Sequence, residues 1–199
     1  MSNDHVSHER THDAFEQNAS EYRSLIIYSI VALAIAFTIR FYIAAPYLVQ
    51  GSSMDPTFHS TDYLIIDRVS YRLGEPERGD VIVFRFPQDP SRSFIKRVIG
   101  LPGETVVIDG QNVSIINGEN PDGFALDEPY IDPANNRPVN LRVVLDDNEY
   151  FVLGDNRKAS ADSRTWGALP RDHIIGRALL RLYPFTDLGI NPGDVGYQK

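Results

Sequence analysis

Apolar and polar positions divide the chain into a polar N-terminal tail, one long apolar segment and a region of short apolar runs. Residues 1–23 are rich in His, Glu and Asp, which is typical of a disordered tail. The next 16 residues, Ser24 to Ile39, carry no charge, and apolar character resumes after Arg40 as far as Ala45. A bilayer requires about 20 apolar residues, and an arginine near a helix end can extend its charge to the interface. We therefore predict a membrane anchor at residues 24–45, with a buried core helix or a cleavable signal peptide as alternatives.

The region 46–199 contains short runs rich in β-branched and aromatic residues, separated by Gly, Pro, Asp and Asn. The runs are Tyr47–Val49, Tyr63–Ile66, Val81–Phe84, Phe94–Ile99, Thr105–Ile108, Val113–Ile116, Leu141–Leu145, Tyr150–Leu153 and Ala178–Leu182. No long amphipathic helical period and no internal repeat follows the apolar segment. This pattern predicts a mainly β fold, with one antiparallel β-sheet domain.

Turn signals subdivide this region further. The dipeptides Asp109-Gly110 and Asn117-Gly118 are typical of β-hairpin turns. The stretch 117–140 is rich in Pro, Gly, Asp and Asn, and we expect a long loop or a small subdomain there. Its composition does not indicate a function.

Composition narrows the possible partners. The chain has 199 residues with 19 basic and 27 acidic side chains, a net charge of −8, which argues against nucleic acid as a partner. The absence of cysteine excludes disulfides, thiolate metal sites and a cysteine nucleophile. We expect no metal and no cofactor, because the cluster His5, His8 and His12 lies in the polar tail.

Ser53 and Lys96 are candidates for a nucleophile and its base. Ser53 lies in Gly-Ser-Ser-Met-Asp-Pro-Thr, and Lys96 follows 43 residues later in Phe-Ile-Lys-Arg-Val-Ile. A serine hydroxyl needs a base, and lysine can serve only when it is neutral, although its ordinary pKa is about 10.4. The apolar neighbours of Lys96 favour a lowered pKa, and Arg97 points to the other face if the segment is a strand. Taken separately, the two segments also fit an ordinary turn and a solvated strand.

A third segment strengthens the catalytic interpretation. Residues 154–167 read Gly-Asp-Asn-Arg-Lys-Ala-Ser-Ala-Asp-Ser-Arg-Thr-Trp-Gly and follow the apolar run that ends at Leu153. This loop concentrates turn-forming residues, aspartates and serines. Loops at strand ends commonly carry functional side chains.

Together these motifs resemble those of the type I signal peptidases, membrane-anchored serine–lysine endopeptidases. The shared segments are Gly-x-Ser-Met-x-Pro-Thr around Ser53, Arg-Gly-Asp-Val-Ile-Val-Phe at 78–84, Ile-Lys-Arg-Val-Ile-Gly-Leu-Pro-Gly-Glu around Lys96, and Gly-Asp-Asn-Arg-x-x-Ser-x-Asp-Ser-Arg at 154–164. Their order is that of the family, and the resemblance extends from about residue 24 to Tyr183. It implies a serine endopeptidase that removes signal peptides after Ala-x-Ala.

The resemblance also implies roles for individual residues. Ser53 attacks the scissile carbonyl, and neutral Lys96 accepts its proton. Ser160 is expected to hydrogen-bond the Lys96 amine and aim it at Ser53. Asp162 and Arg164 are expected to form a charge pair that braces the loop. Asp155, with Asn156, is expected to shape the turn, although turn capping alone also explains these polar residues.

Location and partners follow from the same resemblance. The family places its catalytic domain outside the cytoplasm, which predicts a cytoplasmic N-terminus and a single crossing of a bacterial plasma membrane. The expected partners are signal peptides of exported preproteins and the lipid bilayer.

The sequence departs from the family pattern at two positions. Some relatives offer a serine hydroxyl to the oxyanion two positions before the nucleophile, but here that position is Gly51. We expect the backbone N–H of Ser53 to bind the oxyanion instead. Thr61 precedes Asp62 where the family usually has Gly-Asp, a change expected to affect a turn only.

Substrate binding is expected next to the nucleophile. The segment from Tyr47 to Gln50 can form a sheet edge that pairs with an extended peptide. We expect Val49 and Ile95 to line shallow apolar pockets for small side chains. Simple core packing is the alternative for both residues.

Other readings remain open at this point. His59 or His173 could act as the base for Ser53 in an ordinary triad. The chain could also be another serine–lysine peptidase of related fold, such as a self-cleaving repressor-type protease. A third possibility is a catalytically silent, membrane-anchored β-domain that binds peptides.

Overall fold

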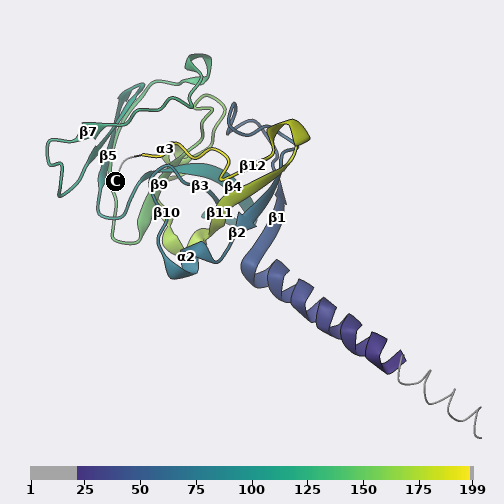
Figure 1. The fold of residues 1–199 in the computed structure, drawn as a ribbon. Helices are drawn as coiled ribbons and strands as arrows, with labels where there is room; N and C mark the ends of the chain where they lie inside the picture. Colours follow the sequence, from purple (N-terminus) through teal and green to yellow (C-terminus); the bar gives the residue numbers. More distant parts are fainter. Residues whose placement is uncertain (1–21, 198–199) are drawn as a thin grey trace, which may run out of the picture. The chain divides into compact units, whose positions relative to one another are not determined.

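The computed structural model describes residues 22–197 (Figure 1), of which 22–43 belong to one compact unit and 44–197 to a second. In the first unit, residues 22–38 form an α-helix that continues as the π-helix η1, Ile39–Ile43. Within residues 22–197 no helix combines the length and apolar character required to span a membrane. Most of the tail predicted at 1–23 lies outside the described residues.

The helix ends at Ile43, two residues before the boundary predicted for the anchor at residue 45. Ala44 begins strand β1, Ala44–Leu48, which pairs antiparallel with β2, Tyr63–Asp67. Ala45 is buried against the sheet. Pro46 lacks a backbone N–H, and it is tolerated because β1 is the edge strand. Pairing with β2 therefore takes Ala44 and Ala45 out of the helical segment.

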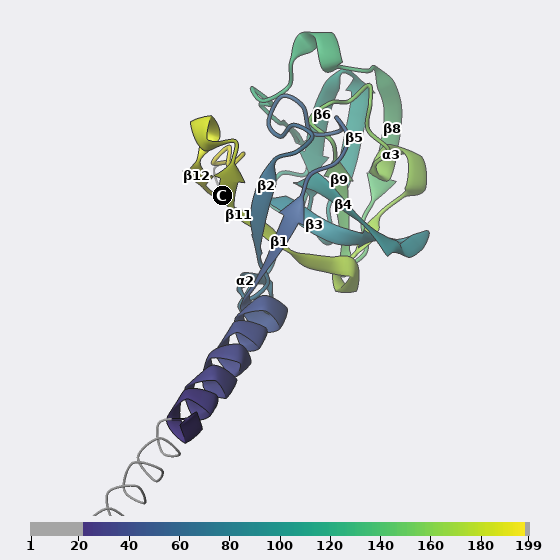
Figure 2. The ribbon, with the colours of Figure 1, turned by 90° about the vertical axis from the view of Figure 1, so that its right-hand side faces the viewer.

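The larger sheet has eight strands and carries the sequence motifs (Figures 1 and 2). Its order is β1-β2-β11-β3-β4-β9-β10, with β12 paired to β11, and every pair is antiparallel. The remaining bounds are β3 Val81–Phe86, β4 Asp89–Gly100, β9 Glu149–Leu153, β10 Leu169–Pro170, β11 Ile174–Tyr183 and β12 Gly189–Ile190. The predicted mainly β, antiparallel fold is confirmed.

A second sheet of four strands has the order β7-β6-β5-β8. Its strands are β5 Thr105–Gly110, β6 Asn112–Ile116, β7 Phe124–Ala125 and β8 Val139–Val144. The hairpin expected at Asp109-Gly110 joins β5 to β6, since Asp109 pairs with Asn112. The stretch 117–140 contains β7 and the 3₁₀ turn η2, Pro133–Asn135, and it returns to the sheet as β8.

Helices in the second unit are short. They are α2 Ser70–Leu73, α3 Ser163–Trp166, η3 Arg171–His173 and η4 Phe185–Asp187, none longer than four residues in the part of this unit that the structure describes. This matches the absence of a helical period in the sequence after the apolar segment.

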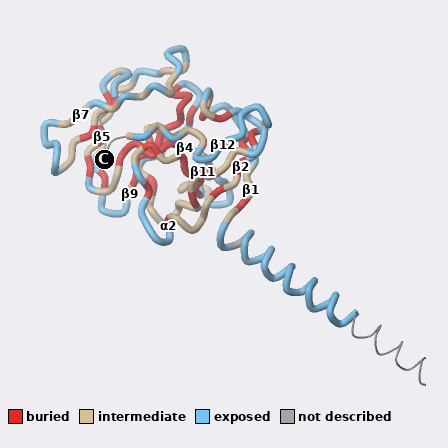
Figure 3. The backbone as a smooth tube through the Cα atoms, in the orientation of Figure 1, coloured by how far each residue is buried: buried red, intermediate tan, exposed pale blue. Residues whose placement is uncertain are grey.

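Buried side chains lie mainly on the strands of both sheets (Figure 3). One buried cluster contains Met54 and Phe58, from the turn after β1, packed with Leu64 and Ile66 of β2. Another lies between the two sheets, where Gly100 is in close contact with Val106, Leu145 and Phe151. A Cβ at Gly100 would come within 2.4 Å of Val106 Cγ2, so the sheets approach too closely there for any other residue.

Thr61 occupies a position where the family usually has glycine, and its backbone conformation is one that glycine adopts more easily. Its φ angle is 80°, in the left-handed region that favours glycine and disfavours β-branched residues. The backbone N–H of Thr61 donates to the carbonyl of Val49, and that of Val49 donates to the carbonyl of Asp62. These two bonds hold the turn beside the nucleophile segment despite the unfavourable φ of Thr61.

Candidate active site

Ser53 lies in a turn that two buried apolar side chains anchor in the core. Met54 is 1% exposed and Phe58 is fully buried, and the backbone N–H of Phe58 donates to the carbonyl of Met54 at 2.9 Å. Ser53 itself is half-buried and lies at the surface of the turn. The apolar positions of the motif therefore present the serine hydroxyl toward β4.

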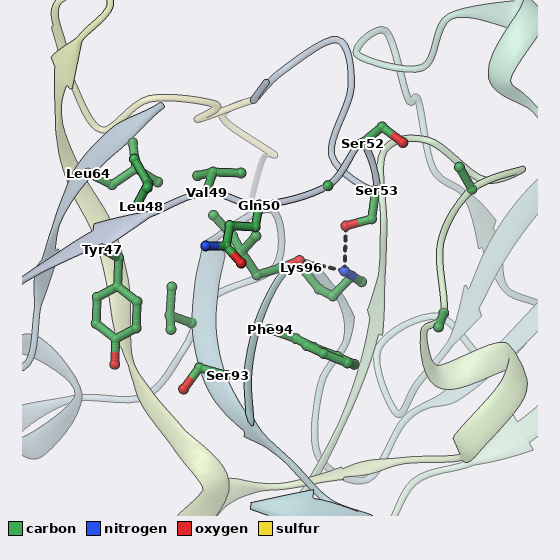
Figure 4. A pocket seen from close by; sticks show the side chains of 15 residues that line it. Tyr47, Leu48, Val49, Gln50, Ser52, Ser53, Leu64, Ser93, Phe94 and Lys96 are labelled. Atoms are coloured by element: carbon green, nitrogen blue, oxygen red, sulfur yellow. Dashed lines mark hydrogen bonds between the residues drawn. The ribbon is translucent and has the colours of Figure 1, made fainter. Parts of the chain in front are cut away.

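Lys96 meets Ser53 from strand β4. Its Nζ lies 2.7 Å from Ser53 Oγ and 2.7 Å from the carbonyl oxygen of Ile95 (Figure 4). The Lys96 side chain is 3% exposed, and Phe94 lies beside it with the ring centroid 5.5 Å from Nζ. Ile82 of β3 pairs with Lys96 and fixes its place in the sheet. The structure thus joins two residues that lie 43 positions apart in the sequence.

Burial makes this lysine a much better base than a solvated one. Burial lowers the pKa of Lys96 from 10.5 to about 8, although the negative charges of Asp162 and Asp155 oppose the shift. At pH 7 a pKa of 8 leaves about one amine in ten neutral, whereas an ordinary lysine is neutral in about one molecule in 2,500. The apolar surroundings seen in the sequence are therefore present in the fold.

Arg97, the next residue, lies on the opposite face of β4 and is also fully buried. Its Nε and Nη2 donate to the two carboxylate oxygens of Asp155 at 2.9 and 2.6 Å. Its Nη1 donates to the carbonyl oxygens of Gly79 and Gly193. Burial by itself would lower the pKa of Arg97, but the bonds to Asp155 outweigh it and raise the pKa. Arg97 is therefore a permanent buried cation with a full set of acceptors.

The Arg97–Asp155 pair connects the segments that carry Ser53, Lys96 and the 154–167 loop. Thr57, at the end of the Ser53 motif, donates its hydroxyl to Asp155 Oδ2 at 2.5 Å. The backbone N–H of Asn156 donates to the carbonyl of Ser53 at 3.1 Å. A Cβ on Gly154 would lie 2.4 Å from that carbonyl oxygen, so only glycine permits this approach. Asp155 therefore does more than shape a turn.

Ser160 does not make the expected hydrogen bond. Its Oγ is buried and makes no hydrogen bond to Lys96 in the described part of the chain; it lies near Asp162 and contributes to lowering the pKa of that carboxyl. The amine of Lys96 bonds Ser53 and the Ile95 carbonyl instead. Ser160 packs against Gly154, where an added Cβ would lie 2.3 Å from the Ser160 Oγ.

Asp162 and Arg164 form the expected ion pair. Arg164 Nε and Nη2 lie 2.8 Å from the two oxygens of Asp162, and Nη2 also donates to the carbonyl of Arg157. Asp162 accepts the backbone N–H of Gly154 at 3.1 Å. Burial raises the pKa of Asp162, but Arg164 outweighs it and holds the pKa below its ordinary value. The pair thus holds the two ends of the loop together.

A groove runs from β1 to β4 past Ser53 (Figure 4). Its volume is about 290 Å³, and the predicted substrate residues Tyr47, Val49 and Ile95 all line it. Ala159 and Ala161, from the loop that carries Ser160, line it as well and were not predicted. Val49 also packs in the core, so both interpretations of this residue hold.

His59 and His173, the two alternative bases, make their hydrogen bonds away from Ser53. His59 Nδ1 is 2.6 Å from Asp55 Oδ1 on the surface, and His173 Nδ1 is 3.0 Å from the carbonyl oxygen of Arg85. Neither histidine hydrogen-bonds Ser53 in the described part of the chain. Residues 22–197 also contain no group of His, Asp or Glu side chains able to hold a metal ion.

Arg97 and Thr57 are the site residues that sequence reasoning missed. Arg97 was assigned only to the opposite strand face, with no partner. The sequence does carry a signal for this, because the dipeptide Lys96-Arg97 lies between two apolar pairs, Phe94-Ile95 and Val98-Ile99. A charged residue in such a segment needs a buried partner of opposite charge, and the fold provides Asp155.

The hydroxyl of Ser53 is hydrogen-bonded to the buried amine of Lys96 beside a groove, and a neutral amine in that place is chemically able to accept a hydroxyl proton. Comparison with known proteins identifies the family. Residues 22–183 match the model of the family described as "Signal peptidase, peptidase S26". The chain belongs to this family and is a peptidase.

Several relatives resemble the chain over most of its length. It is 40% identical over 173 residues to a Synechocystis sp. protein named probable signal peptidase I-2, covering 83% of this chain and 75% of that protein. It is 42% identical over 166 residues to signal peptidase I of Leptolyngbya laminosa, covering 80% and 78%. A crystal structure of a signal peptidase I from Enterococcus faecalis is 30% identical, covers 52% of this chain and 97% of that one, and gives a TM-score of 0.44.

Substitution Arg97→Met should destabilise the protein strongly, because it leaves Asp155, which is 1% exposed, without its cation. We expect a loss of about 3–5 kcal/mol in the free energy of unfolding, measured by urea titration in detergent. The control is Asp187→Asn, which removes an ion pair with Arg181 in which Asp187 is 47% exposed. It should cost about 1 kcal/mol or less. Equal losses in the two variants would contradict the structural importance of the Arg97–Asp155 pair.

Proposed function

We propose that this protein is a membrane-anchored signal peptidase that removes N-terminal signal peptides from exported preproteins after an Ala-x-Ala site. The observation that carries the proposal is the 2.7 Å contact between Ser53 Oγ and the buried Nζ of Lys96. Membership of the signal peptidase family supports the choice of substrate. The names of the relatives at 40–42% identity support it as well.

The reaction proceeds in two steps. Ser53 Oγ attacks the scissile carbonyl carbon while neutral Lys96 accepts the hydroxyl proton, and the resulting ammonium passes that proton to the departing amine. This forms an acyl–enzyme and releases the mature protein. A water molecule then attacks the ester, again losing its proton to Lys96, and the proton returns to Ser53 Oγ as the signal peptide leaves.

The oxyanion is bound by the backbone N–H of Ser53. This N–H donates to no acceptor within the described part of the chain, so it is available for a developing negative charge. Gly51 offers no side-chain donor, and its φ of 90° gives the turn a shape for which glycine is suited.

The groove accepts the substrate as an extended chain. Strand β1 is an edge strand, so one side of its backbone is available for pairing with a peptide. Val49 and Ile95 border the groove near Ser53, together with Ala159 and Ala161. These apolar walls favour small side chains such as alanine before the cleaved bond.

Four polar residues support the catalytic pair in this proposal. Asp155 positions the loop through Arg97, and Asp162 with Arg164 holds the loop's ends. Ser160 remains a proposed orienting residue. Its hydroxyl lies beside Asp162, and its position against Gly154 keeps it within the loop that faces the site.

The apolar segment from residue 24 is the proposed anchor, with the catalytic unit outside the cytoplasm. Its support is that large apolar side chains on this helix are exposed all around it, including Leu25, Ile26, Tyr28, Val31 and Leu33. A chain that begins at Ala44 should leave the membrane fraction and still cleave a peptide. Retention of that shortened chain in alkaline-washed membranes would contradict the anchor.

Substitutions Ser53→Ala and Lys96→Ala should each reduce kcat/KM by about 1,000-fold or more, because nucleophile and base act as one unit. Lys96→Arg should be equally inactive, since a guanidinium cannot accept the proton at neutral pH. The assay is cleavage of a preprotein carrying Ala-x-Ala, with sequencing of the new N-terminus. His59→Ala and His173→Ala are the controls and should retain activity. Near-native turnover by Lys96→Ala would falsify the serine–lysine mechanism.

The pH dependence of cleavage should report Lys96. Its pKa in the folded protein is about 8, and the neutral form is the active one. The value of kcat/KM should therefore rise about tenfold per pH unit below pH 8 and level off above it. A midpoint near pH 6.5 would instead indicate a histidine base.

A further inference from the structure

The buried guanidinium of Arg97 lies against an aromatic ring that comes from outside the four motifs shared with the family. The ring centroid of Tyr130 lies 4.0 Å from Arg97 Cζ, well within the range of a cation–π contact. Tyr130 belongs to the stretch 117–140, whose function the sequence did not indicate. It does not line the groove beside Ser53.

Tyr130 is held in place by hydrogen bonds on its hydroxyl. It donates to Glu128 Oε1 at 2.7 Å and accepts from the hydroxyl of Tyr197 at 3.1 Å. The same Glu128 oxygen accepts from Arg157 Nη2 at 2.5 Å. Arg157 is a buried residue of the loop after β9, and its Nε donates to the carbonyl of Gly154. Tyr130 is thus connected to the catalytic loop on one side and to the C-terminal segment on the other.

The C-terminal segment completes the surroundings of Arg97. The carbonyl oxygen of Gly193 accepts from Arg97 Nη1, and Gly193 packs on Thr57 and Phe58. The ring of Tyr197 packs on Gly79, where an added Cβ would lie 2.8 Å from Tyr197 Cδ2. Gly79 is the other carbonyl acceptor of Arg97. Residues 193 and 197 lie beyond the part of the chain that matches the family, which ends at residue 183.

We propose that Tyr130, fixed by Glu128 and Tyr197, is a positioning residue that holds Arg97 on Asp155 and thereby holds Lys96 against Ser53. The proposal rests on the proposed peptidase function, because Lys96 is the base only in that reaction. Arg97 and Lys96 are adjacent on one strand, so a displaced Arg97 backbone displaces Lys96 directly.

Loss of Tyr130 has a distinct electrostatic consequence. The negative charge of Asp155 raises the pKa of Lys96, and the guanidinium of Arg97 is bonded to both oxygens of that carboxylate. An Arg97 side chain that moves away from Asp155 leaves more uncompensated negative charge near the amine. The pKa of Lys96 then rises, and less of the base is neutral at pH 7.

The test compares Tyr130→Leu with Tyr130→Phe in the full chain, using cleavage of an Ala-x-Ala preprotein. Tyr130→Leu removes the aromatic cover and should lower kcat by about tenfold with little change in KM. The low-pH limb of its kcat/KM profile should move upward by about half a pH unit or more. Tyr130→Phe keeps the ring but loses the bonds to Glu128 and Tyr197, so its kcat and pH profile should lie between those of Tyr130→Leu and the unsubstituted protein.

Tyr150→Leu is the matched control. Tyr150 is buried, whereas Tyr130 is half-buried; the Tyr150 hydroxyl bonds Glu75 at 2.9 Å, and Tyr150 lies outside the groove and the Arg97 surroundings. This variant should lose at least as much stability in urea as Tyr130→Leu but keep kcat and the pH profile. If Tyr130→Leu loses stability alone, with kcat and the pH profile unchanged, the positioning role is overturned.

A second readout separates this proposal from the proposed function. The exchange of the Arg97 Nε–H with solvent, followed by ¹⁵N NMR, requires no enzymatic activity. Exchange should be at least about tenfold faster in Tyr130→Leu than in Tyr130→Phe, because local opening exposes the bonded proton. Equal exchange rates overturn the positioning role, even if the full chain cleaves preproteins. A full chain that cleaves no preprotein overturns the proposed function, and the catalytic part of this inference with it.

Discussion

The buried ion pair between Arg97 and Asp155 is the interaction on which the rest of the site depends. Both side chains are almost completely excluded from water, and a buried charge without a partner is strongly unfavourable. Strand β4 and the loop after β9 must therefore meet at one position. Lys96 precedes Arg97, and Gly154 precedes Asp155, so this single pair brings the base beside the loop that packs on Ser53.

The pKa values of two adjacent basic residues on the two faces of β4 shift in opposite directions. Arg97 has a bidentate carboxylate and two carbonyl acceptors, and it stays charged. Lys96 is equally buried, but its amine contacts only a hydroxyl and one carbonyl, and its pKa falls to about 8. The strand alternation of side chains thus places a permanent cation and a base of lowered pKa next to each other. Asp155 and Asp162 limit how far the pKa of Lys96 can fall.

Local patterns predicted the strands well, because strand formation depends on residues close in sequence, whereas the contact between Ser53 and Lys96, 43 positions apart, was expected only from the family resemblance. The apolar runs at 81–84 and 94–99 became the centres of β3 and β4, and the Ser53 and Lys96 motifs lie where the resemblance implied. Three features could not be predicted because they depend on contacts between distant segments. Ala44 pairs with β2 and is not helical, Ser160 Oγ makes no bond to Lys96, and Arg97 pairs with Asp155, which lies 58 positions away. The covering by Tyr130 and Tyr197 has no signal in either local sequence.

The central claim is that burial lowers the pKa of Lys96 far enough for a substantial fraction of its amine to be neutral near physiological pH, and this pKa can be measured directly. The sequence contains three lysines, so ¹³C-lysine labelling gives few signals, and Lys96→Met assigns the signal of Lys96 while Lys158 serves as the exposed reference. Titration of the Lys96 Cε chemical shift in the folded protein should give a midpoint of about 8. A midpoint above pH 10, as for a solvated lysine, would contradict the account, because the amine beside Ser53 would then be charged at neutral pH.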